Sequence, residues 1–216
     1  MKLIDEVLEL LYPTRCAFCH KLTNGRRERV CPKCRRTLPA VPPTAQIQRF
    51  EGVSACVSPL YYSGLVRESL HRFKFGGLAF YAEIYADFVV KSIDENKITC
   101  DSITWAPISR RRLRKRGYDQ ARLLAEEIAA RIGVPCEQML VKLRNNPPQS
   151  RTENASQRRA NVSGVYGPVP GAQVEGRQIL LVDDIVTTGS TLSECAGVLR
   201  RAGAKEIFAA TVARAK

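Results

Sequence analysis

The 216-residue sequence has no uninterrupted apolar run of the length that a membrane-spanning helix requires. Acidic residues interrupt its first eleven positions, which therefore do not resemble a signal peptide and instead predict a short amphipathic helix. Internal repeats are also lacking. These absences argue against a membrane protein and a repeat protein. We expect a protein of the cytoplasm with no membrane insertion.

Histidine is scarce, with two residues in the chain. His20 directly follows a cysteine, and we expect it beside a metal site rather than among the ligands. His71 lies within a predicted helix. Covalent catalysis needs a nucleophile that is activated by a nearby base. No such pair is evident in the sequence.

Acidic residues are outnumbered, since 34 Lys and Arg face 21 Asp and Glu and leave a net charge of +13. The first 49 residues hold ten of the basic and four of the acidic residues, so the excess is densest there. Such an excess favours polyanionic partners, either nucleic acid or phosphorylated small molecules. A basic surface that only aids solubility would give the same count.

Four of the eight cysteines, Cys16, Cys19, Cys31 and Cys34, form the pattern Cys-x2-Cys-x11-Cys-x2-Cys. Four thiolates in two such pairs are typical of a structural zinc ribbon. Two disulfides are the alternative, which the expected cytoplasmic location disfavours, and iron accepts the same ligands. The other cysteines are scattered, and we expect them to be small buried residues: Cys56, Cys100, Cys136 and Cys195.

Basic residues lie between and after the two cysteine pairs: Lys21, Arg26, Arg27, Arg29, Lys33, Arg35 and Arg36. They suit either a nucleic-acid platform or a structural module with solvated cations. Pro39, Pro42 and Pro43 then form a stiff connector. We therefore predict two domains, a helix and zinc ribbon over residues 1–45 and a larger domain over residues 46–216.

The larger domain alternates strand-like and helix-like patterns, which indicates an α/β fold. Strands are expected at residues 54–60, 102–108, 179–182 and 206–213, and helices at residues 65–73, 78–91 and 119–132. A polar stretch at residues 145–161 has no clear period. Loops of that length are usually functional lids or disordered segments.

The most informative segment is residues 179–192, Ile-Leu-Leu-Val-Asp-Asp-Ile-Val-Thr-Thr-Gly-Ser-Thr-Leu. Four apolar residues predict a buried strand that ends at Asp183 and Asp184. A hydroxyl-rich loop follows, and Thr191 and Glu194 have the spacing of a capping box at a helix start. A glycine-containing loop at a helix N-terminus suits a phosphate, whereas paired carboxylates suit sugar hydroxyls or hydrated Mg²⁺. The segment thus predicts a site for a phosphorylated ribose; the alternative is an acidic Mg²⁺ pocket on another doubly wound sheet.

A second segment with many charges covers residues 109–116, where six of the seven positions after Ser109 are Arg or Lys. It follows a predicted strand and precedes a predicted helix, so we expect a loop. Such a loop would attract a diphosphate or a nucleic-acid backbone, and in an open parallel sheet it would line the ligand crevice. A solvated basic loop is the alternative.

The segment at residues 179–192 closely resembles the phosphoribosyl-pyrophosphate (PRPP) signature of type I phosphoribosyltransferases. Further motifs occur in a fixed order along the chain: the cysteine pairs, Tyr62 with Gly64, Lys74-Phe75, residues 116–121 (Arg-Gly-Tyr-Asp-Gln-Ala), Pro148-Gln149, Arg158, and Asn161-Val162. Together they resemble the ComF/GntX family of competence-associated, phosphoribosyltransferase-like proteins. Asp119 departs from the Asn common in that family, and residues 145–149 depart from its usual Thr-Pro-x-Gln.

The resemblance implies a type I phosphoribosyltransferase-like parallel sheet flanked by helices, with a four-cysteine zinc ribbon. Asp183 and Asp184 would be the catalytic residues and bind the ribose hydroxyls, with Mg²⁺ accompanying PRPP. The PRPP-binding residues would be Thr187, Thr188, Gly189, Ser190 and Thr191 for the 5′-phosphate, Ser109, Arg110 and Arg111 for the pyrophosphate, and Lys74. A lid would carry Arg144, Gln149, Arg158 and Asn161.

Three functions follow as hypotheses. The family implies a PRPP-binding protein that acts in natural competence and DNA uptake, with single-stranded DNA and a helicase-like motor protein as partners. An active salvage phosphoribosyltransferase with an unidentified acceptor would keep the same PRPP residues. A regulator that senses PRPP or nucleotides would keep them as well.

Overall fold

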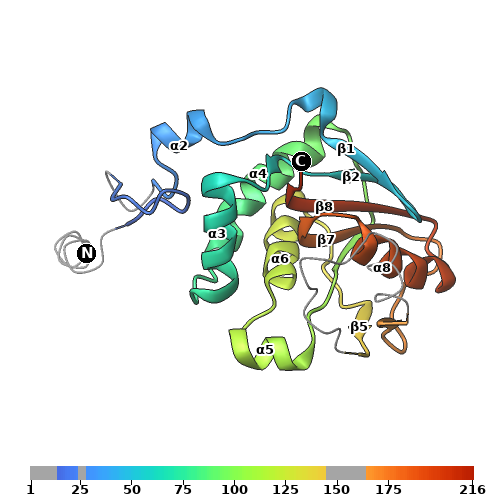
Figure 1. The fold of residues 1–216 in the computed structure, drawn as a ribbon. Coiled ribbons are helices and arrows are strands. Elements are labelled where there is room, and N and C mark those ends of the chain that lie inside the picture. The colour runs from blue at the N-terminus through green and yellow to red at the C-terminus, as the bar shows by residue number, and fades with distance from the viewer. Residues whose placement is uncertain (1–13, 24–27, 145–163) are drawn as a thin grey trace.

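The computed structural model describes residues 14–23, 28–144 and 164–216 (Figure 1). The expected helix near the start of the chain and the lid candidates Gln149, Arg158 and Asn161 lie outside these residues. Among the described residues, no helix is both long and apolar enough to cross a membrane.

One sheet forms the centre of the larger domain, with the strand order β1-β2-β8-β7-β4 and with β3 paired to β8 (Figure 1). β2, β8, β7 and β4 are mutually parallel neighbours, whereas β1 is antiparallel to β2 at one edge. The strands are β1 (Ile47–Phe50), β2 (Val53–Val57), β3 (Leu60–Tyr61), β4 (Ser102–Trp105), β7 (Gln178–Val186) and β8 (Glu206–Arg214). The expected α/β class is confirmed, with β1 as an antiparallel addition.

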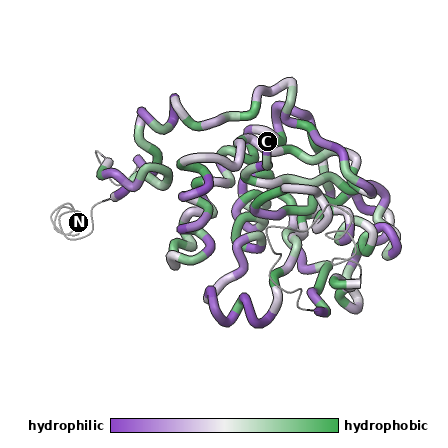
Figure 2. Tube along the Cα trace, in the orientation of Figure 1, coloured by the Kyte–Doolittle hydropathy of each residue, from purple (hydrophilic) through white to green (hydrophobic). Residues whose placement is uncertain are grey.

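Helices cover both faces of this sheet. α3 (Gly64–Phe75), α4 (Tyr81–Glu95) and α6 (Gln120–Ile132) lie on one face, and α8 (Ser190–Arg201) lies on the other (Figure 1). Leu180 and Val182 pack into the first core, and Ile179 and Leu181 pack into the second. Burial on both faces explains why β7 begins as an unbroken apolar run. In Figure 2 the hydrophobic residues gather on these strands.

Smaller elements surround the sheet. β5 (Leu140–Lys142) and β6 (Tyr166–Pro168) form an antiparallel pair beside α8. A 3-10 helix covers Pro43–Ala45, and α2 (Pro32–Thr37) follows the third cysteine of the ribbon. None of these elements was predicted, because each is too short to show a hydrophobic period.

Residues 110–116 are helical, so the prediction of a loop after Ser109 was wrong. The Ser109 hydroxyl accepts a hydrogen bond from the Arg112 N–H at 3.4 Å, and α5 (Arg110–Arg116) ends at Gly117, whose φ is +83°. A serine N-cap and a left-handed glycine C-cap are strong helix boundaries. They fix a short helix although its sequence is almost wholly cationic.

Two details of the segment at residues 179–192 also differ from the prediction. β7 does not end at the acid pair but continues to Val186, because Asp183, Ile185 and Val186 keep pairing with β8. The capping box is absent: α8 has Gly189 as its N-cap without a side-chain hydrogen bond. Glu194 instead accepts a hydrogen bond from the backbone N–H of Gly164 at 2.6 Å, which ties α8 to the segment that enters β6.

The cysteine ribbon docks on α3 and α4. Phe18 lies edge-on to Tyr85 and Phe88 of α4, with ring centroids 6.1 and 5.8 Å apart. From α3, Ser69 donates to the Ala17 carbonyl at 2.6 Å, and Arg72 donates to the Phe18 carbonyl at 2.5 Å. The ribbon therefore shares its hydrophobic core with the larger domain. The division at residue 45 stays a prediction.

Candidate functional site

The acid pair lies near the carboxyl end of β7, opposite the last turn of α3. Lys74 of α3 places its ammonium nitrogen 2.9 Å from a carboxylate oxygen of Asp184. Both side chains are largely buried, with 22% and 14% of their surfaces exposed. Because water is mostly excluded from this ion pair, it is stronger than an exposed pair of the same length. Lys74 and the acid pair, predicted separately from the sequence, thus form one site.

Asp183 is the more deeply placed of the two acids. Burial raises its pKa to about 8, the charge of Asp184 adds to the shift, and the backbone N–H of Asp184 at 2.8 Å and the charge of Lys74 oppose it. Burial and the charge of Asp184 therefore both disfavour the ionised form of the Asp183 carboxyl. A cation or hydroxyl donor that approached it would favour the ionised form.

The acid pair has the right donor chemistry for magnesium. Mg²⁺ is usually held by one or two carboxylates together with substrate phosphates and water, and Asp183 and Asp184 offer that number of carboxylates. Among the described residues, no larger group of acids or histidines accompanies them, because the only cluster of three or more potential ligands is the set of four cysteines. A metal at the acid pair would therefore depend on oxygens from a ligand.

The predicted phosphate loop joins β7 to α8. The Thr188 and Ser190 hydroxyls lie 2.8 Å apart, and Gly189 takes the left-handed conformation with φ of +75° directly before the helix. The loop thus presents hydroxyls and the free N–H groups of a 12-residue helix at one point. This arrangement suits a phosphate, as the sequence predicts.

Phe50 of β1 covers the glycine of this loop. A Cβ at Gly189 would lie 2.1 Å from the nearest Phe50 ring carbon. The loop and the edge strand are therefore matched to each other, and β1 has a role that its short sequence did not suggest.

Replacement of Gly189 by alanine is expected to lower the free energy of unfolding by about 1–3 kcal/mol, because the left-handed backbone costs about 1 kcal/mol and the Phe50 ring must move. Urea unfolding would measure the change. Gly171→Ala is the matched control: its φ is +78°, but an added Cβ would meet no atom within 4 Å. An equal loss in both variants would contradict the close contact, and Phe50→Ala should recover part of the Gly189→Ala loss.

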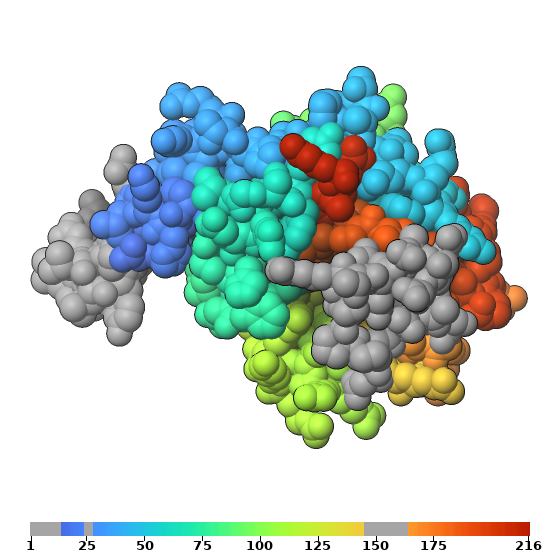
Figure 3. Space-filling model, in the orientation of Figure 1, coloured from blue at the N-terminus to red at the C-terminus, as the bar shows by residue number. Residues whose placement is uncertain are grey.

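The start of the basic segment, residues 109–111, makes no hydrogen bond or ion pair with the acid pair among the described residues. Ser109 is buried and its hydroxyl is used as the cap of α5, whereas Arg110 and Arg111 are exposed. α5 projects from the surface in Figure 3. Ser109 and Arg110 line a pocket of about 880 Å³ together with Trp105, Lys142 and the lid candidate Arg144. The structure thus brings Arg144 close to Ser109 and Arg110. Among the described residues, none of these three contacts Asp184.

Residues that the sequence did not single out as ligands also reach this region. Asp119 caps α6 and accepts from the Ile108 N–H at 2.9 Å, which fixes the chain that leads from β4 into α5. Lys142 donates to the Tyr166 hydroxyl at 3.1 Å. Burial and the charge of Arg112 lower the pKa of Lys142, and the charge of Asp183 opposes them. Nothing in the periodicity of β5 and β6 could have placed this pair near the acids.

The four cysteines of the ribbon fit a tetrahedral metal. Their sulfurs all lie within 4.8 Å of one another, and those of Cys19 and Cys31 are 3.8 Å apart. Zn–S bonds of about 2.3 Å in a tetrahedron separate the sulfurs by about 3.8 Å. The backbone N–H groups of Cys31 and Cys34 donate to the sulfurs of Cys16 and Cys31. All eight cysteines are free of disulfides, so the disulfide alternative is wrong.

The four cysteines outside the ribbon were predicted to be buried. Cys56 and Cys195 are buried as predicted, whereas Cys100 and Cys136 are only partly buried.

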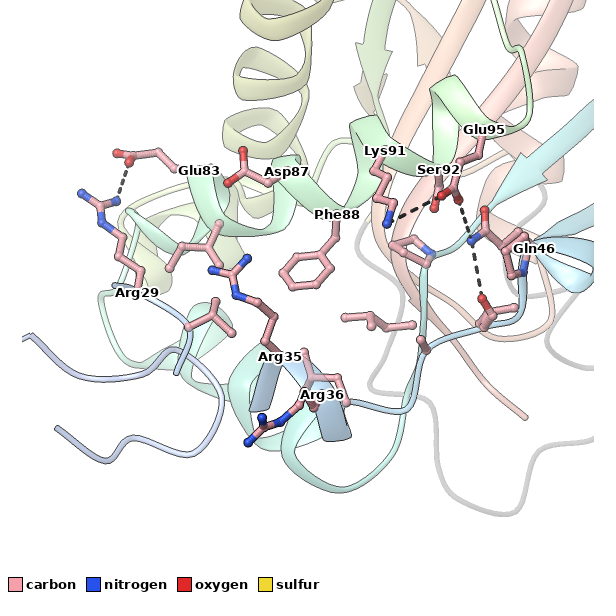
Figure 4. A pocket seen from close by; sticks show the side chains of 18 of the residues that line it. Arg29, Arg35, Arg36, Gln46, Glu83, Asp87, Phe88, Lys91, Ser92 and Glu95 are labelled. Atoms are coloured by element: carbon pink, nitrogen blue, oxygen red, sulfur yellow. Dashed lines mark hydrogen bonds and ion pairs between the residues drawn. The ribbon is translucent and has the colours of Figure 1, made fainter. Parts of the chain in front are cut away.

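A second pocket, of about 670 Å³, lies where the ribbon meets α4 (Figure 4). Each of its acids has a basic partner: Glu83 pairs with Arg29, Asp87 with Arg131 and Glu95 with Lys91. Gln46 adds a hydrogen bond to Glu95 at 3.4 Å. These contacts join the ribbon, the connector and α4, so the pocket belongs to the docking of the ribbon rather than to the acid pair.

Family comparisons agree with both parts of the chain. Residues 119–216 match the model of the phosphoribosyl transferase domain, and residues 7–46 match that of the double zinc ribbon domain. The first match includes the acid pair, the loop and α8. The second includes all four clustered cysteines and supports structural zinc.

Named relatives point the same way. Competence protein F of Haemophilus influenzae is 34% identical over 116 residues, 53% of this chain and 51% of that protein. Competence protein ComFC of Bacillus subtilis is 31% identical over 147 residues, 66% of this chain and 56% of that protein. These matches thus span about half of each relative. DNA utilization protein YhgH of Salmonella typhimurium is 27% identical over 203 residues, 89% of this chain and 86% of that protein.

Solved structures give weaker matches. Adenine phosphoribosyltransferase from Thermoanaerobacter pseudethanolicus has a TM-score of 0.41 and 16% identity, and the match covers 65% of this chain and 83% of that one. Glutamine PRPP amidotransferase from B. subtilis has a TM-score of 0.40 and 24% identity, and the match covers 62% of this chain and 26% of that one.

Proposed function

Because this chain belongs to the ComF family of phosphoribosyltransferase-like proteins, we propose that it binds PRPP with Mg²⁺ at the carboxyl end of β7 and acts in DNA uptake. One observation carries the proposal: a single continuous segment presents Asp183, Asp184, the Gly189 loop and the start of α8 in that order. A phosphorylated ribose needs acceptors for the hydrogen bonds of its hydroxyls and donors to its phosphate, and this segment supplies both.

The loop would hold the 5′-phosphate through backbone N–H groups and through the hydroxyls of Thr188 and Ser190. Asp183 and Asp184 would accept hydrogen bonds from the ribose hydroxyls. Magnesium, bound with PRPP, would offset the charge of the phosphate oxygens. In that complex the acid pair would face the developing positive charge on the ribose, and preorganised carboxylates stabilise such a charge.

The part in DNA uptake rests on relatives that are named for competence and DNA utilization. Single-stranded DNA would bind to exposed cations, of which α5 supplies the densest group, and a helicase-like motor is the expected protein partner. The basic excess of this chain is compatible with a nucleic-acid partner.

An active phosphoribosyltransferase is the second candidate, and one specific observation favours it. The pocket of about 880 Å³ at the end of β4 combines Trp105, Leu113 and Leu143 with polar groups. Its volume is that of a small-molecule site. A nucleobase or amine acceptor would fit there, whereas a regulator that only senses PRPP needs no such space.

Calorimetric titration with PRPP and Mg²⁺ tests the proposal. Wild-type protein should bind, and Asp183→Asn/Asp184→Asn should bind about 10–100-fold more weakly, because charge-assisted hydrogen bonds are lost. Asp94→Asn removes an exposed acid of α4 and should bind like the wild type. No binding by the zinc-loaded wild type would overturn the proposal. Release of pyrophosphate with one particular acceptor would establish the transferase.

A further inference from the structure

Gln120 carries a buried amide nitrogen for which the described residues provide no well-aligned acceptor. It is the first residue of α6 and is 1% exposed. Its side-chain oxygen accepts a hydrogen bond from Arg116 at 2.8 Å, whereas its amide nitrogen makes no hydrogen bond of good geometry among the described residues, although the Tyr118 side chain lies near enough to interact with it. Buried polar groups are nearly always hydrogen-bonded, so an unpaired amide next to a candidate site calls for an acceptor.

Arg116 is held beside the same site by other contacts. Its guanidinium carbon lies 4.9 Å from the centroid of the Phe75 ring, and Phe75 directly follows Lys74. Burial lowers the pKa of Arg116, while the charge of Asp184 raises it. Arg116 is therefore close to the Lys74–Asp184 ion pair and is oriented by an aromatic ring on one side and Gln120 on another.

Lys74, Arg116 and Gln120 together offer more donors than the protein uses. Arg116 has five N–H groups, Lys74 has three and the Gln120 amide has two. Within the described ranges, one N–H of Arg116 goes to Gln120, one of Lys74 goes to Asp184, and the Gln120 amide makes no well-aligned hydrogen bond. The unused donors rather than net charge favour an anion here, because three carboxyl groups lie near these two cations: those of Asp119, Asp183 and Asp184. The surplus of donors suits an anion with several oxygens.

The start of α5 lacks these properties. The Ser109 hydroxyl is occupied as a helix cap, and Arg110 and Arg111 are exposed, with no hydrogen bond or ion pair to the rest of the described chain that would fix their guanidinium groups. An arginine that is already oriented loses less conformational entropy on binding than an exposed one.

We infer that the pyrophosphate group of PRPP binds to Lys74, Arg116 and Gln120 instead of Ser109, Arg110 and Arg111. This inference rests on the proposed function. It assigns the diphosphate to donors at the ends of α3 and α5 and the start of α6, beside the acid pair that takes the ribose. It also leaves the exposed cations of α5 available for another anion.

Three probes distinguish the parts of this site: inorganic pyrophosphate, PRPP, and ribose 5-phosphate, which lacks the diphosphate. Arg116→Met and Gln120→Met should each weaken pyrophosphate and PRPP binding about tenfold or more and leave ribose 5-phosphate binding unchanged. Retained binding of ribose 5-phosphate also shows that the variant is folded. The matched control, Arg110→Met/Arg111→Met, should bind all three probes like the wild type.

Two results would overturn the inference. In the first, the Arg110/Arg111 variant loses pyrophosphate binding, whereas the Arg116 and Gln120 variants bind pyrophosphate like the wild type. The other is wild-type protein that binds ribose 5-phosphate and PRPP equally well, which would mean that no diphosphate subsite exists. Wild-type protein that binds none of the three probes would instead refute the proposed function, and this inference with it.

Discussion

Cys34→Ala is expected to abolish zinc binding and to unfold the ribbon, with a large loss of stability. Cys34 is 2% exposed and is one of four sulfurs that lie within 4.8 Å of one another. Three remaining thiolates bind zinc far more weakly, and apparent zinc-binding free energies of about 10–16 kcal/mol at structural sites are also folding free energies. Metal analysis and thermal unfolding of the purified protein measure the two effects.

Cys56→Ala is the matched control for this prediction. Cys56 is equally buried but lies in β2, outside the cluster, so its variant should keep the full zinc content and lose only the small packing contribution of one sulfur. Stoichiometric zinc in Cys34→Ala, or wild-type protein with neither zinc nor iron, would contradict the metal site.

The second large effect concerns α5 and rests on the proposed binding of single-stranded DNA. Five of its side chains are exposed and form no ion pair with the described residues: Arg110, Arg111, Arg112, Arg114 and Lys115. If each meets one phosphate, affinity for oligothymidylate should fall on the order of 100-fold when salt rises from about 50 to about 200 mM, because each contact releases counterions.

Substitution of Arg111, Arg114 and Lys115 by glutamine should weaken binding at low salt and reduce this salt dependence. The control replaces Arg67, Arg201 and Lys205 by glutamine, which changes the net charge equally at exposed positions elsewhere. Filter binding or fluorescence anisotropy at several salt concentrations gives both slopes. Equal losses in the two variants would show that net charge rather than α5 attracts the DNA.

α5 has a further property that favours an anion. Like charges stand four residues apart in three places: Arg110 with Arg114, Arg111 with Lys115, and Arg112 with Arg116. Each such pair destabilises an isolated helix by a few tenths of a kcal/mol. The caps at Ser109 and Gly117 hold the helix together despite this repulsion. Bound phosphates would remove the repulsion, so binding and helix stability reinforce each other.

The sequence predicts the α/β class, the four-cysteine cluster and the buried core strand of β7, because each depends on composition or spacing that is local in the chain. The meeting of Lys74 with Asp184 joins segments more than a hundred residues apart, and only the resemblance to the family suggested it. Both acids were expected after the end of β7. They lie within it because hydrogen bonds to β8 outweigh the low strand propensity of aspartate.

Other parts of the site depend on tertiary contacts that no local pattern reports. The ring of Phe50, which covers Gly189, belongs to β1, a strand of only four residues. Lys142 of β5 donates to Tyr166 of β6, and these two strands are also short. The capping-box spacing of Thr191 and Glu194 was misleading, because Glu194 found a better-placed donor in Gly164. Local helix-start signals give way when a side chain has a competing tertiary partner.

α3 connects the two halves of the molecule mechanically. Its Ser69 and Arg72 hold the carbonyls between the first two cysteines, and two residues further on Lys74 holds Asp184. Any rotation of this helix that follows a change in the ribbon also displaces an ammonium group at the acid pair. If loss of the metal rotates α3, the affinity of the acid pair for its ligand changes with it, and by linkage the ligand then changes the affinity for the metal by the same factor.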